Sequence, residues 1–316
     1  MSQHDRSIKK TEKALRTPGS LDRGPVEFKS HIVSHEGEIM AIATRDVISV
    51  PPTMRILSAV ETMTKCGFRR LPVIDPGSRK LRGIVTSGDI INFLGGGDKY
   101  NLVRVRHGGN LLAAVNESIR TIMTTQLTTL PESAGIADAL DIIMTRMIGG
   151  LPIIGEGDRV TGIVTERDVM KALAGEHIDE TAEDVMSTAL RVTNPDATIG
   201  EVTRDMTKHR FRRLPVVSDD ILFGIITTSD ILRYFGDRKI FSRMETGNVK
   251  ELMNMPVRNL VSGNLFTTTP DRNVNEIARD MMERSVGALP VIENTRLIGL
   301  VTEFDLVKTF ARGVLT

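Results

Sequence analysis

The sequence predicts an α+β fold made of four β-α-β-β-α units that are arranged as two pairs. One motif recurs four times along the chain, and its copies alternate in type. Each copy has an apolar-Pro-apolar strand start, followed by Gly-apolar-apolar-Thr-x-x-Asp. The strand starts are Leu71-Pro72-Val73, Leu151-Pro152-Ile153, Leu214-Pro215-Val216 and Leu289-Pro290-Val291. The glycine and the aspartate are six positions apart in the copies Gly83/Asp89, Gly162/Asp168, Gly224/Asp230 and Gly299/Asp305.

An earlier proline marks the beginning of each unit. Pro51, Pro131, Pro195 and Pro270 precede the second prolines by 21, 21, 20 and 20 residues. The stretch between the prolines has helical periodicity, since Ile136, Leu140 and Ile143 fall on one face at steps of three and four. A strand from the Leu-Pro, a polar turn and a strand from the glycine follow, and a second helix begins near Thr-x-x-Asp. Each unit is therefore expected to run strand, helix, strand, strand, helix.

The copies are of two types. The first and third share Phe-Arg-Arg-Leu-Pro, whereas the second and fourth have Gly149-Gly150 and Gly287-Ala288 before the Leu-Pro. This alternation indicates that the working unit is a pair, because a lone unit with few strands would be only marginally stable. The expected units are residues 39–97, 118–176, 181–237 and 248–312, with a polar flexible tail at 1–38 and a linker at 98–117. The three glycines at 95–97 are interpreted as a helix stop that opens a flexible linker.

Composition excludes several classes of protein. The 41 Lys and Arg against 40 Asp and Glu leave a net charge of +1, so a strongly basic nucleic-acid wrapper is excluded. One cysteine, Cys66, allows neither an internal disulfide nor a cysteine-cluster zinc site. No apolar run is long enough to span a bilayer, and residues 1–10 have no signal-peptide core. We therefore expect a cytoplasmic protein with no membrane partner and no metal site.

The four Thr-x-x-Asp motifs have two interpretations. They are Thr86/Asp89, Thr165/Asp168, Thr227/Asp230 and Thr302/Asp305. A threonine at a strand end with an acid three positions later forms a capping box for the next helix. The same place can bind a nucleotide, because a helix start attracts phosphate and an aspartate can accept two hydrogen bonds from a ribose diol. No Ser-His-Asp set or pair of catalytic carboxylates is indicated by spacing, so we expect no enzyme activity.

The paired arginines of the odd units are a second candidate feature. Arg69 and Arg70, and likewise Arg212 and Arg213, come directly before the Leu-Pro. The planar guanidinium binds two phosphate oxygens at once, although a solvated strand edge with surface ion pairs is the alternative. Successive strand residues face opposite ways, so we expect only one arginine of each pair to serve a ligand. The glycines of the even units allow close ligand approach without charge. The glycines before the last strands either admit a purine ring or form bulges.

The four-fold pattern resembles tandem CBS domains, a family named after cystathionine β-synthase, over about residues 39–312. Two tandem CBS units form a disc-like Bateman module, so the resemblance implies two pseudo-two-fold Bateman modules. The arrangement is also similar to that of the γ subunit of AMP-activated protein kinase. The resemblance implies that the threonines contact phosphate and the aspartates contact ribose. It also implies that Arg69 and Arg70 lie near Asp168, and Arg212 and Arg213 near Asp305. The sites that use Asp89 and Asp230 would be weaker, empty or suited to a less anionic adenosine compound.

The resulting hypothesis is a non-catalytic, energy-sensing regulator that binds AMP, ADP or ATP as a ligand rather than as a catalytic cofactor. Its output would require a separate effector protein or association into a homodimer through the modules. One alternative is a nucleic-acid-binding regulator that uses the basic tail and the linker. Another is a sensor of S-adenosylmethionine, because the glycine segments of the even units supply no charge for phosphate.

Overall fold

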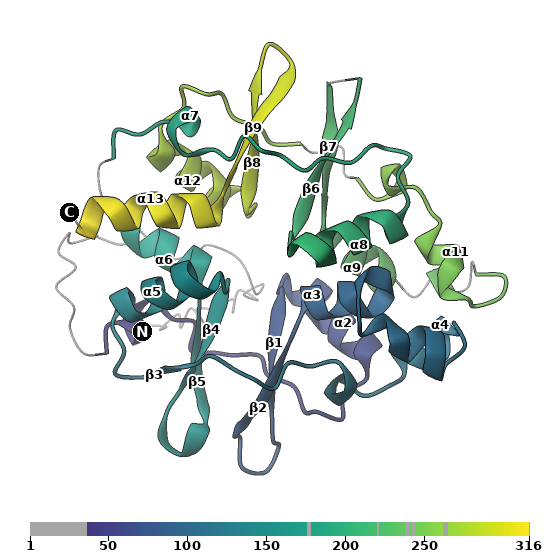
Figure 1. Cartoon of the computed structure of the whole chain (residues 1–316). Helices are drawn as coiled ribbons and strands as arrows, with labels where there is room; N and C mark the ends of the chain where they lie inside the picture. Colours follow the sequence, from purple (N-terminus) through teal and green to yellow (C-terminus); the bar gives the residue numbers. More distant parts are fainter. Residues whose placement is uncertain are drawn as a thin grey trace, which may run out of the picture.

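The structure is a computed structural model that describes residues 37–175, 178–219, 221–237, 240–241, 244–261 and 265–315. The described residues form a rounded assembly of four units (Figure 1). Units 1 and 2, the first module, form one half, and units 3 and 4, the second module, form the other. The expected tail at 1–38 lies outside the described residues except for its last two positions. Within the described ranges, no helix is both long enough and apolar enough to cross a membrane.

The first module follows the expected element order. Unit 1 contains α1 (Ile39–Ile42), α2 (Ile56–Cys66), β1 (Arg70–Ile74), β2 (Leu81–Thr86), α3 (Ser87–Ile91) and the π-helical turn η1 (Asn92–Gly96). The connection to unit 2 contains the π-helical turn η2 (Leu102–Arg106) and α4 (Leu111–Val115). Unit 2 contains the short 3-10 turn η3 (Ile119–Thr121), β3 (Leu130–Pro131), α5 (Ile136–Arg146), β4 (Gly150–Ile154), the 3-10 turn η4 (Glu156–Asp158), β5 (Val160–Thr165) and α6 (Glu166–Leu173).

The second module repeats this order. Unit 3 contains α7 (Ala182–Val185), α8 (Ile199–His209), β6 (Arg213–Ser218), β7 (Ile221–Thr227) and α9 (Thr228–Gly236). Unit 4 contains α11 (Val249–Met253), the 3-10 turn η5 (Val257–Asn259), α12 (Val274–Glu283), β8 (Ala288–Glu293), β9 (Arg296–Thr302) and α13 (Glu303–Leu315).

The first strand of each unit is shorter than expected. Unit 2 has a two-residue strand, β3, and the other units have one isolated parallel bridge in its place. Val50 of unit 1, for example, exchanges hydrogen bonds with Pro72 and Ile74 of β1. The residue that would donate next in a parallel ladder is two positions further, Pro52, which has no N–H. Pro195 and Pro270 hold the equivalent position in units 3 and 4, whereas Pro131 of unit 2 is itself the second residue of β3.

Each hairpin contains a bulge beside its glycine. The pairing register of β1 and β2 shifts just after Val73, which pairs with Gly83, and the other three units shift at the equivalent position. The bulge interpretation of these glycines is therefore confirmed. Their open faces are occupied by protein rather than left for a purine. A Cβ at Gly83 would lie 2.9 Å from Sδ of Met123, which belongs to unit 2.

This packing is reciprocal within each module. Gly162 of unit 2 faces Ala43 and Thr44 of unit 1, while the Gly83 of unit 1 faces unit 2. In the second module, Gly224 of unit 3 faces Val261, and Gly299 of unit 4 faces Met186. Each unit thus places its leading segment over the last strand of its partner. The exchange supports the pairing of unit 1 with unit 2 and of unit 3 with unit 4.

The apolar cores lie between the modules. One buried cluster joins units 1 and 3 and includes Ile90 of α3 and Ile231 of α9. The other joins units 2 and 4 and includes Val169 of α6 and Leu306 of α13. Figure 1 shows α6 beside α13 and α3 beside α9. Each helix that begins at a Thr-x-x-Asp motif therefore packs against the equivalent helix of the other module.

The three glycines at 95–97 differ from the expected flexible linker. Gly95 and Gly96 belong to the turn η1, which packs on α8 of unit 3. A Cβ at Gly96 would lie 2.7 Å from the carbonyl oxygen of Thr203. Gly95 has a φ of 157°, which side chains rarely allow. The glycines are required here because two backbones approach closely, and the segment is a packing contact between modules.

Candidate functional site

All four Thr-x-x-Asp motifs form capping boxes. Each threonine ends a strand, and the aspartate is the third residue of the following helix. The threonine hydroxyl and backbone N–H both donate to Oδ2 of the aspartate, and the hydroxyl distances are 2.7, 2.7, 2.6 and 2.7 Å for Thr86, Thr165, Thr227 and Thr302. The capping alternative is therefore present in every unit. Capping uses only Oδ2 of each aspartate. Whether the motif can also bind a ligand therefore depends on the contacts of Oδ1.

In the odd units the second oxygen already has a cationic partner. Lys99, just after the three glycines, forms an ion pair with Oδ1 of Asp89, and the hydroxyl of Thr124 lies 3.5 Å from the same oxygen. Nη1 of Arg233 lies 3.2 Å from Oδ1 of Asp230. A ligand that needs these oxygens must displace a cation of the protein.

In the even units the second oxygen has no such partner. Among the described residues, Oδ2 of Asp168 and of Asp305 accepts the capping bonds, and no hydrogen bond or ion pair engages Oδ1. Burial raises the pKa of Asp168 and of Asp305 above the usual range of aspartate, although the threonine hydrogen bonds partly oppose it. These two carboxylates therefore retain acceptor capacity in a partly desolvated place.

The second arginine of each pair reaches the even unit of its own module. Nη1 of Arg70 donates to the carbonyl oxygen of Gly149, and Nη1 of Arg213 donates to the carbonyl oxygen of Gly287. A Cβ at Gly150 would overlap the guanidinium of Arg70, and a Cβ at Gly287 would lie 2.9 Å from Nη2 of Arg213. The small residues of the even units thus admit arginine side chains in this structure. They were expected to allow close approach of a ligand.

The first arginine of each pair crosses to the other module. Nη1 of Arg212 lies 2.7 Å from Oε2 of Glu166 in unit 2. Nη2 of Arg69 lies 3.3 Å from Oε2 of Glu303 in unit 4. Both arginines of a pair therefore turn toward the centre, and the alternation along a strand does not send one of them to solvent. Arg70 and Arg213 thus contact the even unit of their own module, whereas Arg69 and Arg212 contact the even unit across the centre. Among the described residues, no hydrogen bond or ion pair joins these arginines to Asp168 or Asp305, so the expected proximity to those aspartates stays a prediction.

A fifth arginine completes the central arginine cluster, which we define as Arg69, Arg70, Arg167, Arg212 and Arg213. Nε of Arg167 lies 2.6 Å from Oε1 of Glu303, and its Nη2 donates to the carbonyl oxygen of Val286. Five guanidinium groups surround two carboxylates, Glu166 and Glu303. The centre therefore has an excess of positive charge where all four units meet, and it should attract an anion.

The pKa values of the cluster reflect this crowding. Burial, and then the neighbouring arginines, lower the pKa of Arg70 and of Arg213 to about 10. Burial alone would raise the pKa of Glu303, but Arg69 and Arg167 outweigh it and hold that pKa below its usual value. Glu303 is thus ionised at neutral pH, and a phosphate near the arginines would relieve the remaining repulsion between guanidinium groups.

Glu166 and Glu303 were not singled out from the sequence. The signal was present, because both even units read Thr-Glu-x-Asp, whereas the odd units have Ser87 and Thr228 after the threonine. The glutamate side chains are 7% and 3% exposed. Their arginine partners come from the opposite module, and no spacing in the sequence indicates that contact.

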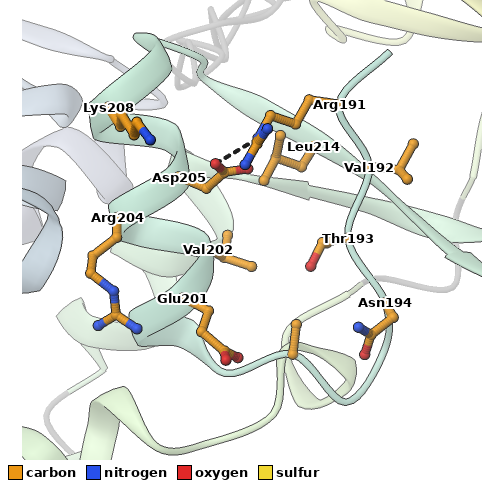
Figure 2. Close-up of a pocket in the computed structure, with 11 residues that line it drawn as sticks. Arg191, Val192, Thr193, Asn194, Glu201, Val202, Arg204, Asp205, Lys208 and Leu214 are labelled. Carbon is orange, nitrogen blue, oxygen red and sulfur yellow. Dashed lines mark hydrogen bonds and ion pairs between the residues drawn. The ribbon is translucent and has the colours of Figure 1, made fainter.

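Two cavities lie against the odd units. One of about 420 Å³ lies between α8 and the segment that precedes Pro195, and it includes Thr193 and Leu214 (Figure 2). Arg191 and Asp205 form an ion pair on its wall, with Nε 2.5 Å from Oδ2. The other, of about 350 Å³, is lined by residues 45–49 of unit 1 and by Val160 of unit 2. Both cavities use the segment that leads into the first proline of an odd unit.

Exposed apolar side chains mark the same two units. Val192 and Ile48, three positions before the first proline, are 46% and 39% exposed. Phe211 and Phe68, directly before the arginine pairs, are 44% and 38% exposed. Flat or branched apolar groups next to polar walls suit a heterocyclic base. No group of three or more His, Cys, Asp or Glu side chains in the described part of the chain is arranged to hold a metal ion.

Comparison with known proteins agrees with this architecture. The family model of the CBS domain matches residues 37–96, 119–175, 182–237 and 249–312. The chain is 40% identical over 277 residues to the uncharacterized protein MJ1225 of Methanocaldococcus jannaschii, which covers 86% of this chain and 99% of that protein. The crystal structure of MJ1225, described as a proposed archaeal homolog of g-AMPK, has a TM-score of 0.83 to this structure at 38% identity, again over 86% and 99% of the two chains.

A more distant relative is a subunit of a kinase. The chain is 27% identical over 205 residues to human 5'-AMP-activated protein kinase subunit gamma-3, which covers 60% of this chain and 40% of that protein. Four matches to one family model, together with a relative that aligns with 86% of this chain over nearly its whole length, account for nearly all of the described residues. The chain therefore belongs to the CBS domain family, with four CBS domains that form two modules.

Proposed function

We propose that this protein is a non-catalytic regulator that binds adenine nucleotides in two clefts, one in each module. One observation carries the proposal. Among the described residues, the second oxygen of Asp168 and of Asp305 forms no hydrogen bond or ion pair, whereas that of Asp89 and of Asp230 is paired with a cation. A carboxylate with remaining acceptor capacity suits the two hydroxyl groups of a ribose. The similarity to subunit gamma-3 of 5'-AMP-activated protein kinase supports a ligand of the same class.

The phosphate end of the ligand would face the central arginine cluster. Arg70 reaches unit 2, which carries Asp168, and Arg213 reaches unit 4, which carries Asp305. The helices α6 and α13 begin directly after the same threonines, and the positive end of the helix dipole there favours an anion. Ribose on the aspartate and phosphate on the arginine can thus belong to one ligand in each module.

The base would lie toward the cavities of the odd units. The cavity in unit 3 lies on β6, the strand that begins with Arg213, and the cavity in the first module contains Ile74, at the end of the strand that begins with Arg70. The exposed Phe211 and Phe68 are directly before the same arginine pairs. The two phenylalanines do not line the cavities, but the exposed Val192 and Ile48 do, and apolar groups on a polar wall support a purine rather than a charged group at that end.

Substitution of Asp168 and Asp305, whose Oδ1 atoms form no hydrogen bond or ion pair among the described residues, tests the proposal. Asp168→Asn and Asp305→Asn keep the size of the side chain and can still cap the helix, but remove the charge. We expect each change to weaken AMP or ATP binding by about tenfold or more in isothermal titration calorimetry, because charged hydrogen bonds contribute about 1.5 to 3 kcal/mol. Asp89→Asn is the matched control and should leave affinity unchanged. Unchanged affinity in both test variants would reduce the motif to helix capping.

Thermal denaturation tests the ligand class. AMP, ADP or ATP at 100-fold excess over Kd should stabilise the folded chain by about 2.7 kcal/mol. S-adenosylmethionine is the rival ligand. Heat of binding from S-adenosylmethionine, with none from any adenine nucleotide, would contradict the phosphate role of the arginines. We further propose that the bound nucleotide acts on a separate effector protein by shifting the packing between the modules.

A further inference from the structure

The residue after each threonine of Thr-x-x-Asp lies buried where the four units meet. These residues are Ser87, Glu166, Thr228 and Glu303, which are 5%, 6%, 3% and 3% exposed. In the odd units they contact each other, since the hydroxyl of Thr228 lies 3.2 Å from the hydroxyl oxygen of Ser87. In the even units the same position carries a negative charge. The two sides of the centre therefore differ: the side where units 1 and 3 meet carries neutral hydroxyl groups, and the side where units 2 and 4 meet carries carboxylates.

Each glutamate adjoins one cleft and holds an arginine of the other. Glu166 follows Thr165 at the start of α6, in the cleft of the first module, but its partner Arg212 belongs to the second module. Glu303 follows Thr302 in the second module, and its partner Arg69 belongs to the first. A phosphate in either cleft would meet a carboxylate that already engages a guanidinium. A buried carboxylate repels each negative charge that comes near it and competes for the same donors.

We propose that Glu166 and Glu303 select ligands by the charge of their phosphate end, and oppose occupancy of both clefts by highly charged ligands at once. This inference rests on the proposed nucleotide function. Each added phosphate raises the repulsion from the nearby glutamate, so the glutamates favour a ligand of low charge. The neutral Ser87 and Thr228 exert no such effect in the odd units.

Arg212 and Arg69 explain physically why a ligand in one cleft would disfavour an anionic ligand in the other. A phosphate in the second module that draws Arg212 toward itself takes it away from Glu166. Glu166 then remains buried without its partner, beside the cleft of the first module, and an unpaired buried charge is costly. A second anionic ligand there meets a stronger negative field. Arg69 and Glu303 form the reverse path, in which Glu303 keeps Arg167 as a partner and so loses only part of its compensation. The coupling between the clefts is the same whichever ligand binds first, as linkage requires.

Calorimetric titration of Glu166→Gln and Glu303→Gln with adenosine, AMP and ATP tests the inference. Glutamine keeps the shape and can still accept a hydrogen bond, but carries no charge. We expect ATP affinity to rise by about tenfold, AMP affinity to rise less, and adenosine affinity to stay unchanged. The wild-type ATP isotherm should show two unequal steps that become more equal in the variants. Glu276→Gln, which removes an exposed surface pair with Arg272, is the matched control.

The titrations distinguish a wrong role for the glutamates from a wrong ligand class. An unchanged ratio of ATP to AMP affinity in both variants, with nucleotide binding intact, overturns the inference alone. Equal changes in adenosine and ATP affinity also overturn the inference, since they indicate a structural effect.

If the wild-type chain binds no nucleotide, the proposed function fails, and titration with inorganic pyrophosphate tests the glutamates directly. Pyrophosphate should then bind the glutamine variants more tightly than the wild type, and equal binding contradicts the inference. Glu166→Gln removes only one ion pair and is the variant to use if Glu303→Gln does not fold.

Discussion

Arg212 of the second module and Glu166 of the first lie 2.7 Å apart, Nη1 to Oε2, at the centre of the molecule. Arg69 and Glu303 form the equivalent contact in the reverse direction. The two modules are thus joined by apolar helix contacts and also by ionic contacts that cross the centre. Because each arginine comes directly before a strand of one module, β1 or β6, and its glutamate begins a helix of the other, side chains alone connect the two proposed clefts.

Breaking one of these contacts should destabilise the chain. Glu166→Ala leaves Arg212 without its carboxylate, and we expect a loss of about 1 to 2 kcal/mol in urea denaturation, less than for a fully buried pair because Arg212 is 34% exposed. The double variant Glu166→Ala/Arg212→Ala should recover part of the loss. Glu276→Ala is the surface control. Strict additivity of the two single changes would contradict a direct interaction.

The arginines that stay within a module should act on phosphate. Arg70→Ala and Arg213→Ala should weaken ATP binding by about tenfold while adenosine binding changes little, because a charged donor to phosphate is lost. Arg279→Ala removes the same charge from the exposed face of α12 and serves as the control. Calorimetry of both ligands gives the comparison, and an equal loss for adenosine would assign these arginines a purely structural role.

The number of bound nucleotides should be two for each chain. Asp89 and Asp230 are each engaged by a cation of the protein, whereas Asp168 and Asp305 are not, within the part of the chain that the structure describes. Native mass spectrometry at an AMP concentration just above Kd should show two bound molecules at most, and Asp168→Asn should leave mainly one at the same concentration. Binding of four AMP molecules with similar affinity would show that Lys99 and Arg233 do not prevent binding at Asp89 and Asp230.

Nucleotide binding should weaken in mild acid. Burial raises the pKa of Asp168 and Asp305 in the folded chain, so each ionised carboxylate costs stability at neutral pH, and this cost disappears as the pH falls below the raised pKa. The ionised form is the one that accepts two hydrogen bonds from ribose. Affinity should therefore decline at a higher pH than an ordinary aspartate would give. Titrations between about pH 7 and pH 5 check this, and the double variant Asp168→Asn/Asp305→Asn should lose most of the dependence.

Much of the fold could be predicted because its signals are local. The Leu-Pro strand starts, the glycines and the Thr-x-x-Asp helix starts report backbone geometry within a few residues, and the structure has a hairpin and a helix at each. The three glycines at 95–97 were misinterpreted for the same reason. Their local signal indicates flexibility, but the backbone of α8 that they approach lies about a hundred residues away in sequence.

The candidate site could be predicted only in part. The four aspartates and the arginine pairs were visible as repeated polar positions, yet their sequence contexts do not indicate which carboxylate oxygens stay available. Lys99, which pairs with Asp89, lies in the connection between units 1 and 2, outside the repeated motif. Glu166 and Glu303 each follow a threonine of the motif, but their partners lie in the other module.

By itself the sequence determined the repeated unit, its pairing and the candidate groups for ribose and phosphate, because periodicity and turn chemistry act over short distances along the chain. Only the tertiary structure decided that Arg70 and Arg213 stay within their modules while Arg69 and Arg212 cross between them. Adjacent arginines are equivalent in sequence. Their partners differ because the helices of units 1 and 3, and of units 2 and 4, bury their apolar faces together and so bring the carboxylates of one module within reach of the other.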